Sequence, residues 1–183
     1  MDGLVKKIGK TGLYVVDGDI TKIPADALIT AINSGGMWFG GIDGAIQRVA
    51  GDHYHSQASK AMPLQNLQTI IAKGGARPDR KIGFRDVVFV VDDLRSPLDE
   101  VVYAGLEAAH SQNYGKILIP TIRMGVMAGV VEKTPQEAIS KLGAGIGRFM
   151  DQYGAKTKMN NLTFVVYGDV ATAMKLRSGL SSN

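Results

Sequence analysis

The segment from Asn33 to Ile46 holds the residue types in this chain that are best suited to perform chemistry. It follows a short apolar run, begins with an amide, continues through a loop rich in glycine, and reaches Gly41-Ile42-Asp43-Gly44, which has the pattern of a helix start. The N–H groups and the dipole of a helix N-terminus favour an anion. The segment therefore predicts a cradle for a phosphate or a sugar. The alternative is a flexible surface loop in which Asp43 only caps the helix.

The composition excludes several other kinds of site. The chain has 183 residues with no cysteine and 3 histidines, which excludes disulfides, thiolate zinc sites, iron–sulfur clusters and thiol nucleophiles. Chemistry must then come from carboxylates, amides, hydroxyls, imidazoles or the backbone. A formal net charge of +4 is a mild bias toward anionic partners. The 23 glycines matter more, because glycine beside a strand end lets the backbone approach a ligand closely.

Length and hydropathy predict one globular domain over residues 1–183. With 45% hydrophobic and 21% charged residues the chain has an ordinary globular composition. No apolar run reaches the ~18 residues of a membrane helix, and the first residues lack the apolar stretch of a signal peptide. We therefore expect a cytoplasmic protein with no membrane partner.

Two pairs of polar residues resemble metal ligands at first sight. His53 and His55 lie two residues apart with no evident third ligand, so we interpret them as surface histidines. Asp92 and Asp93 close an apolar run, where they would either hold a cation or form a solvated strand end. We favour the solvated end and predict neither a metal nor a cofactor.

The predicted elements alternate between strand and helix. Short runs of β-branched and apolar residues indicate strands, at Gly12–Val16, Ala27–Ala31, Thr69–Ala72, Asp86–Val91, Lys116–Ile119 and Leu162–Tyr167. Most of these runs are continuously apolar, which is typical of strands buried on both faces. Capping patterns predict helices that begin at Pro97 and Pro135, with Ser96 and Thr134 as caps, and two more are expected from Asp43 to about Ala50 and after Asp169. This order predicts an α/β fold, a three-layer α/β/α sandwich with a mixed, mostly parallel sheet.

A ligand of such a fold binds beyond the carboxyl ends of the strands. The segments that follow four of the predicted strands are small, polar or rich in glycine: Asp17–Ile20, Asn33–Gly36, Thr121–Gly125 and Tyr167–Asp169. We therefore expect them to surround one site.

Three of the chain's motifs resemble those of the macrodomain family, in the same order and with similar spacing. Gly18-Asp19-Ile20-Thr21 resembles the family's Gly-Asp-Ile-Thr, and Thr30-Ala31-Ile32-Asn33 resembles its Asn-Ala-Ala-Asn. The third motif, Gly40-Gly41-Ile42-Asp43-Gly44-Ala45-Ile46, resembles its Gly-Gly-Val-Asp-Gly-Ala-Ile. Further along, Lys116–Ile122 resembles the strand before the family's second ligand loop.

The resemblance implies an ADP-ribose pocket. Asp19 would accept a hydrogen bond from the adenine amino group, and the backbone of Ile20 would recognise the adenine ring. Tyr167 would flank the adenine, and the alternative for it is a core aromatic. Asn33 would contact the distal ribose, and Asp43 would orient or deprotonate a water. Backbone groups would hold the diphosphate and the distal ribose, from Gly40, Gly41 and Ile42 in one loop and from Arg123, Met124, Gly125, Val126 and Met127 in the other.

Some residues depart from the family pattern. Gln47 stands where many hydrolases of the family carry histidine, and Met37-Trp38-Phe39 interrupts the glycine run. Arg123 replaces a hydroxyl residue of the second loop, where it would pair with a phosphate or point to solvent.

The resemblance implies an ADP-ribosyl hydrolase whose partner is ADP-ribose or an ADP-ribosylated protein or nucleic acid, with Asn33 and Asp43 as catalytic residues. The alternatives are an ADP-ribose-1″-phosphate phosphatase, which Arg123 would suit, and a non-catalytic reader of ADP-ribose or poly(ADP-ribose). Direct nucleic-acid binding would use the basic residues of one stretch: Lys73, Arg77, Arg80, Lys81 and Arg85. Because glycines and a proline interrupt it, we interpret this stretch as a solvated loop.

Overall fold

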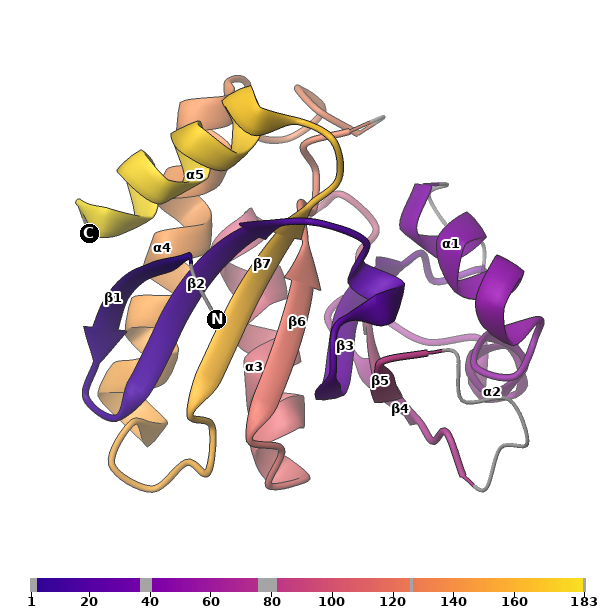
Figure 1. Ribbon diagram of the computed structural model, residues 1–183. Coiled ribbons are helices and arrows are strands. Elements are labelled where there is room, and N and C mark those ends of the chain that lie inside the picture. Colours follow the sequence, from indigo (N-terminus) through magenta and orange to yellow (C-terminus); the bar gives the residue numbers. More distant parts are fainter. Residues whose placement is uncertain (1–2, 37–40, 76–81, 126, 183) are drawn as a thin grey trace.

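The computed structural model describes residues 3–36, 41–75, 82–125 and 127–182, and a seven-stranded sheet lies at its centre (Figure 1). The strand order is β1-β2-β7-β6-β3-β5-β4. The five inner strands are parallel, and β1 and β4 pair antiparallel at the two edges, which confirms the predicted mixed, mostly parallel sheet. The strands are β1 (Leu4–Ile8), β2 (Thr11–Asp17), β3 (Ala25–Ile32), β4 (Thr69–Ala72), β5 (Phe84–Val91), β6 (Lys116–Pro120) and β7 (Asn161–Val166).

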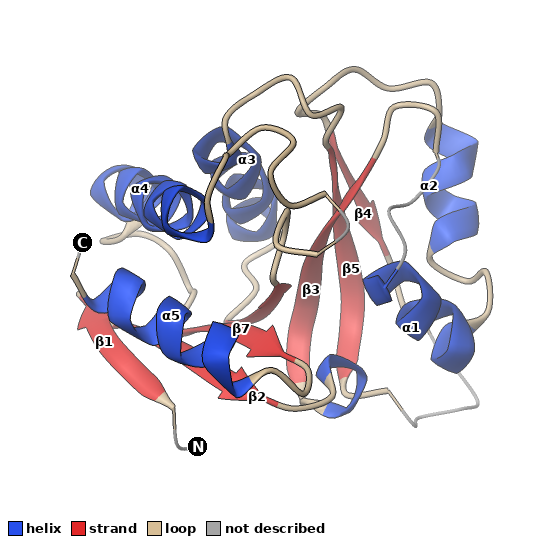
Figure 2. Cartoon of the chain, turned by 90° about the horizontal axis from the view of Figure 1, so that it is seen from above, coloured by secondary structure: helices blue, strands red, loops and turns tan. Residues whose placement is uncertain are grey.

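Helices cover both faces of the sheet, as Figure 2 shows from above. They are α1 (Gly41–Ala50), α2 (His55–Ala61), α3 (Leu98–Ser111), α4 (Pro135–Tyr153) and α5 (Val170–Ser181), and a 3-10 turn spans Ile20–Lys22. One buried cluster unites the sheet with α3, α4 and α5, and the other unites it with α1 and α2. The predicted three layers are therefore confirmed. No helix in the described ranges has the length and apolar character needed to cross a membrane.

Helix starts follow the capping patterns of the sequence with one exception. Thr134 accepts a hydrogen bond from Glu137 N at 3.1 Å, and Asp169 accepts one from Thr172 N at 3.0 Å. Helix α3 begins one residue later than expected, with Pro97 at its cap position and no capping side chain of its own. The carboxylate of Glu132, from a distant loop, accepts a hydrogen bond from Leu98 N at 3.1 Å instead.

Two glycines allow α3 to pack closely against its neighbours. A methyl group on Gly145 of α4 would lie 2.6 Å from the carbonyl oxygen of Asp99, and one on Gly105 of α3 would lie 2.7 Å from Ile29. Such distances are too short for a side chain. Gly145 therefore belongs to a contact between helices, which gives this helical glycine a structural role.

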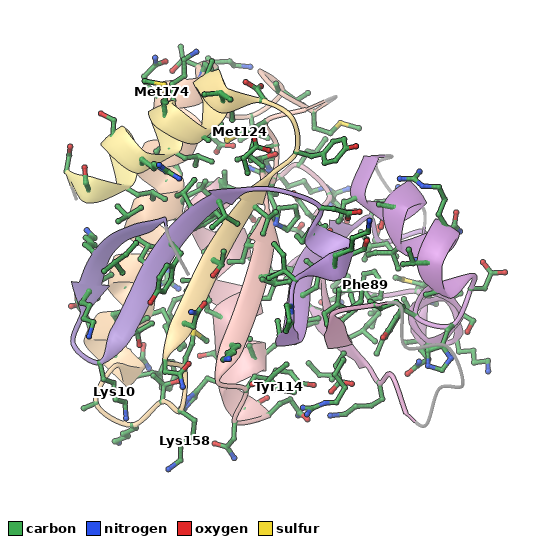
Figure 3. All side chains as sticks on the ribbon, viewed as in Figure 1. Lys10, Phe89, Tyr114, Met124, Lys158 and Met174 are labelled. Carbon is green, nitrogen blue, oxygen red and sulfur yellow. The ribbon has the colours of Figure 1, made fainter. Side chains whose placement is uncertain are left out.

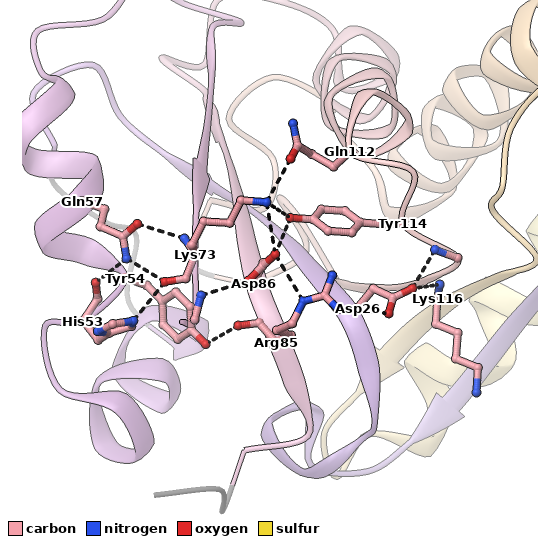
Figure 4. Close-up of polar contacts among 12 residues, drawn as sticks. Asp26, His53, Tyr54, Gln57, Lys73, Arg85, Asp86, Gln112, Tyr114 and Lys116 are labelled. Carbon is pink, nitrogen blue, oxygen red and sulfur yellow. Dashed lines mark hydrogen bonds and ion pairs between the residues drawn. The ribbon is translucent and has the colours of Figure 1, made fainter. Parts of the chain in front are cut away.

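A polar cluster lies at the opposite end of the sheet from Met124 (Figure 3). The buried carboxylate of Asp86 accepts hydrogen bonds from Tyr114 Oη at 2.6 Å and from Gly74 N at 2.9 Å, and Lys73 and Arg85 approach it to 3.5 Å (Figure 4). Burial raises the pKa of Asp86, but these hydrogen bonds and positive charges outweigh burial and hold the pKa below its ordinary value. Burial and the bond to Asp86 raise the pKa of Tyr114.

This cluster also concerns the basic stretch considered for nucleic-acid binding. Its two described members, Lys73 and Arg85, both form ion pairs with Asp86. Arg77, Arg80 and Lys81 lie outside the described residues.

Candidate functional site

A cavity of about 480 Å³ lies at the carboxyl ends of the inner strands, where the fold predicts a ligand. Its wall combines the segments that follow β2, β5, β6 and β7 with the end of β3 and the first turns of α1. The lining residues are Gly18, Asp19, Ile20, Thr30, Ala31, Gly41, Ile42, Asp43, Ala45, Arg48, Asp92, Leu94, Pro120, Thr121, Ile122, Arg123, Gly125, Met127, Val165 and Tyr167.

The first region of the wall contains Asp19 and Tyr167. Oδ1 of Asp19 accepts hydrogen bonds from Oγ1 of Thr21 at 2.7 Å and from its N–H at 3.0 Å. The hydroxyl bond is the main reason that the pKa of Asp19 lies below its ordinary value, against a smaller opposing effect of burial. Asp19 is thus an ionised acceptor. The side chain of Tyr167 is 83% exposed, so the interpretation of Tyr167 as a core aromatic is wrong.

A second region is the start of α1, where Asp43 is fully buried. Nε2 of His55, the first residue of α2, lies 2.9 Å from Oδ1 of Asp43, and both side chains are at most 1% exposed. The interpretation of His55 as a surface residue is therefore wrong, because its ring is buried against Asp43 and against Phe89 of β5. His53 is exposed as expected, and its Nε2 lies 2.9 Å from the carbonyl oxygen of Lys73.

The third region is a buried ion-pair network centred on Arg123. Its guanidinium donates two hydrogen bonds to Asp92 at 2.7 and 3.1 Å, one to Glu132 at 2.9 Å, and one to the carbonyl oxygen of Ser96 at 2.8 Å. The interpretation that the side chain points to solvent is therefore wrong. Its three nitrogens already donate to protein groups, and pairing of Arg123 with a phosphate stays a prediction. Asp92 is buried, so a solvated strand end is wrong for it.

The Arg123 network supports the second loop of the site. Burial would lower the pKa of Arg123, but the hydrogen bonds and charges of the two carboxylates raise it above its ordinary value. The backbone of Arg123 has a φ of +59°, in the left-handed region that side chains seldom adopt. The ion pairs therefore hold a strained turn in the segment that continues to Gly125 and Met127 in the cavity wall.

Asn33 forms a local hydrogen bond in the loop that follows β3. Its Oδ1 accepts a hydrogen bond from Gly35 N at 3.0 Å, and Ser34 N donates to Asp93 at 2.8 Å. Asp93 N donates in turn to Asn66 at 2.9 Å. This chain of contacts fixes the turn after β3 against the segment after β5.

Most of the predicted site residues meet in one wall. Asp19, Ile20, Gly41, Ile42, Asp43, Arg123, Gly125, Met127 and Tyr167 line the cavity, whereas Asn33 and Met124 are not among the lining residues. Gly40, Val126 and Trp38 lie outside the described residues.

Sequence reasoning missed Arg48, which lines the cavity with Gly41 and Ala45. The spacing of these three residues along α1 is that of one helical face, so periodicity could have identified it. Within the described ranges no three His, Asp or Glu side chains group as metal ligands do.

Comparison with known proteins identifies the family. No family model matches the chain. A relative from Escherichia fergusonii, named O-acetyl-ADP-ribose deacetylase, is 31% identical over 127 residues, which are 64% of this chain and 70% of the relative. A solved mutant of the Oceanobacillus iheyensis macrodomain superposes on 97% of this chain and 95% of its own with a TM-score of 0.78. The chain belongs to the macrodomain family.

The structural likeness extends to macrodomains of other organisms. The Trypanosoma brucei macrodomain, solved in complex with ADP-ribose, covers 96% of this chain and 73% of its own length with a TM-score of 0.78 at 19% identity. At this identity the likeness shows the macrodomain fold. The roles of individual side chains in this macrodomain must be argued from its own geometry.

Proposed function

We propose that this macrodomain binds ADP-ribose in the cavity at the carboxyl ends of its strands. The observation that carries the proposal is that one cavity joins an ionised acceptor, Asp19, to the N-terminus of α1. Asp19 suits the amino group of adenine, and the exposed ring of Tyr167 suits its face. The N-terminus of α1 suits the diphosphate.

The names of similar proteins support the same ligand. The Escherichia fergusonii relative is named for a reaction of O-acetyl-ADP-ribose. The Trypanosoma brucei macrodomain has been solved in complex with ADP-ribose.

We further propose that the bound molecule is hydrolysed at its distal ribose, with Asp43 as the group that handles the proton. A water oxygen bonds to the anomeric carbon while the bond from that carbon to the attached group breaks. Asp43 accepts a proton from the water and returns it to the departing group. The neighbouring diphosphate stabilises the positive charge that develops on the sugar.

One observation favours a second candidate, a reader that binds ADP-ribose without cleaving it. The burial of Asp43 and its bond to His55 would also be expected if the carboxylate had only a structural role and connected α1 to α2. The phosphatase alternative loses its attraction, since the Arg123 guanidinium is committed to Asp92 and Glu132.

A panel of substrates separates these candidates. The wild type and Asp43→Asn, which keeps an oxygen acceptor for His55, are incubated with an ADP-ribosylated protein, an ADP-ribosylated oligonucleotide, O-acetyl-ADP-ribose and ADP-ribose-1″-phosphate. We expect the wild type to release ADP-ribose from the ADP-ribosylated protein or oligonucleotide, and Asp43→Asn to be slower by about 10²-fold or more. Release from O-acetyl-ADP-ribose alone would contradict this step, because removal of the acetyl group breaks an ester bond at the acetyl carbonyl and no bond of the anomeric carbon. Equal rates for the two proteins would remove Asp43 from the mechanism. Binding without release from any substrate would establish the reader.

A further inference from the structure

The contact between His55 and Asp43 joins the proposed site to a helix that does not reach it. Asp43 lines the cavity, whereas no residue of α2 is among those that line it. His55 contacts the site through the hydrogen bond between its Nε2 and Oδ1 of Asp43. We propose that His55 is a positioning residue, which holds the Asp43 side chain in one orientation. This inference rests on the proposed hydrolysis at the distal ribose.

The proposed chemistry sets the direction of the hydrogen bond. A carboxylate that is to accept a proton from water can only accept hydrogen bonds, so Nε2 of His55 would be the donor to Oδ1. This bond limits rotation of the carboxylate and keeps it in one position for the transfer.

The surroundings of the pair are largely apolar. The ring of Phe89 on β5 packs at 5.1 Å from the His55 ring, and Ile46 of α1 and Ala58 of α2 belong to the same buried cluster. The other charged groups on these elements are not part of this cluster. On α1, Arg48 is exposed and lines the same cavity as Asp43, and on α2, Lys60 is exposed. On and beyond β5, Arg85 and Asp86 belong to the cluster around Tyr114, and Asp92 pairs with Arg123.

Helix α2 is fastened on its other side, which makes it a firm support for His55. The Gln57 amide donates to the carbonyl oxygen of Lys73 and accepts from its N–H, both at 2.9 Å, and His53 contacts the same carbonyl (Figure 4). These contacts tie α2 to the chain just after β4. His55 therefore presents its imidazole to Asp43 from a fixed position, as a positioning residue requires.

Two amide variants that differ in reach test the proposal. In His55→Gln the side-chain amide extends far enough to replace Nε2 as a donor, whereas the shorter amide of His55→Asn does not. The control is His110→Leu, which removes an imidazole packed against Tyr153 of α4, on the other face of the sheet. For each protein we measure kcat and KM on a substrate that the wild type cleaves, the Kd for ADP-ribose, the pH profile of kcat, and Tm.

We expect His55→Asn to lower kcat by about 10- to 100-fold, with the Kd for ADP-ribose changed by less than about 3-fold. His55→Gln should keep most of kcat, and His110→Leu should change Tm but leave kcat in place.

Equal kcat values for the Asn and Gln variants would overturn the positioning role and leave the proposed hydrolysis standing. A parallel loss of kcat and ADP-ribose affinity with Tm would also overturn it, since a purely structural contact behaves in that way. A wild type that binds ADP-ribose but cleaves nothing would overturn the proposed hydrolysis itself, and the positioning role with it.

Discussion

The guanidinium of Arg123 donates two hydrogen bonds to the carboxylate of Asp92, from Nη2 to Oδ1 at 2.7 Å and from Nε to Oδ2 at 3.1 Å. Its remaining donor nitrogen, Nη1, binds Glu132, which also accepts the first N–H of α3. One side chain therefore links the segment after β5, the start of α3 and the loop after β6. We infer that the shape of the cavity depends on this network as well as on the residues that would touch a ligand.

Replacing Arg123 should destabilise the fold more than an ordinary loop substitution. Arg123→Met leaves Asp92 and Glu132 buried without their cation, so the free energy of unfolding should fall by about 3–5 kcal/mol. Arg123→Lys keeps the charge but cannot make the same forked contacts, so its loss should be smaller. Urea denaturation measures both changes. A loss below about 1 kcal/mol for Arg123→Met would contradict a structural role for the network.

The cluster around Asp86 should control stability in acid. Its pKa is lowered in the folded protein, so the stability that it contributes is present above its unfolded pKa of ~3.9 and is lost as the pH falls through the folded value. Tyr114→Phe removes one donor, should cost about 1–3 kcal/mol at neutral pH, and should move acid unfolding to higher pH. Denaturation curves at a series of pH values measure both effects. An unchanged acid midpoint would show that the Tyr114 hydroxyl does not stabilise the Asp86 carboxylate.

Two glycines of α4 form a matched pair for testing the helix contact. In Gly145→Ala the new methyl group would meet the backbone of Asp99, and we expect a loss of about 1–3 kcal/mol of stability. In Gly147→Ala the methyl group has nothing within 4 Å, so helix propensity alone should add about 0.5–1 kcal/mol. Thermal unfolding compares the two proteins. A gain of stability in both variants would show that the distance between α3 and α4 is less tightly constrained.

Asp19 should recognise the amino group of adenine. Asp19→Asn preserves an acceptor for Thr21 but removes the charge, so the Kd for ADP-ribose should rise by about 10-fold or more. The matched ligand is the hypoxanthine analogue of ADP-ribose, which lacks the amino group. Wild type should bind the analogue more weakly than ADP-ribose, and Asp19→Asn should discriminate much less. Equal discrimination by both proteins would place the adenine elsewhere.

The buried strands and the helix caps could be predicted from the sequence because their signals are local. Two elements were missed for physical reasons. Strand β1 is a half-exposed edge strand with Lys6 and Lys7 at its centre, so it lacks the apolar run of an inner strand. Helix α2 begins without a side-chain cap, and five of its seven residues are polar or charged.

The positions of the site segments could be predicted from motifs, but the partners of the site's charged side chains could not. Arg123 lies 31 residues from Asp92, and His55 lies 12 residues from Asp43. Packing of separate elements brings these pairs together and buries them. No local pattern distinguishes such residues from charged residues that remain in solvent.

Titration of the wild-type protein with ADP-ribose in a calorimeter tests the central claim most directly. The account predicts one ligand per chain with a Kd in the micromolar range or tighter, and a raised Tm in the presence of the ligand. No binding heat and no change in Tm at millimolar ADP-ribose would contradict the assignment of the cavity.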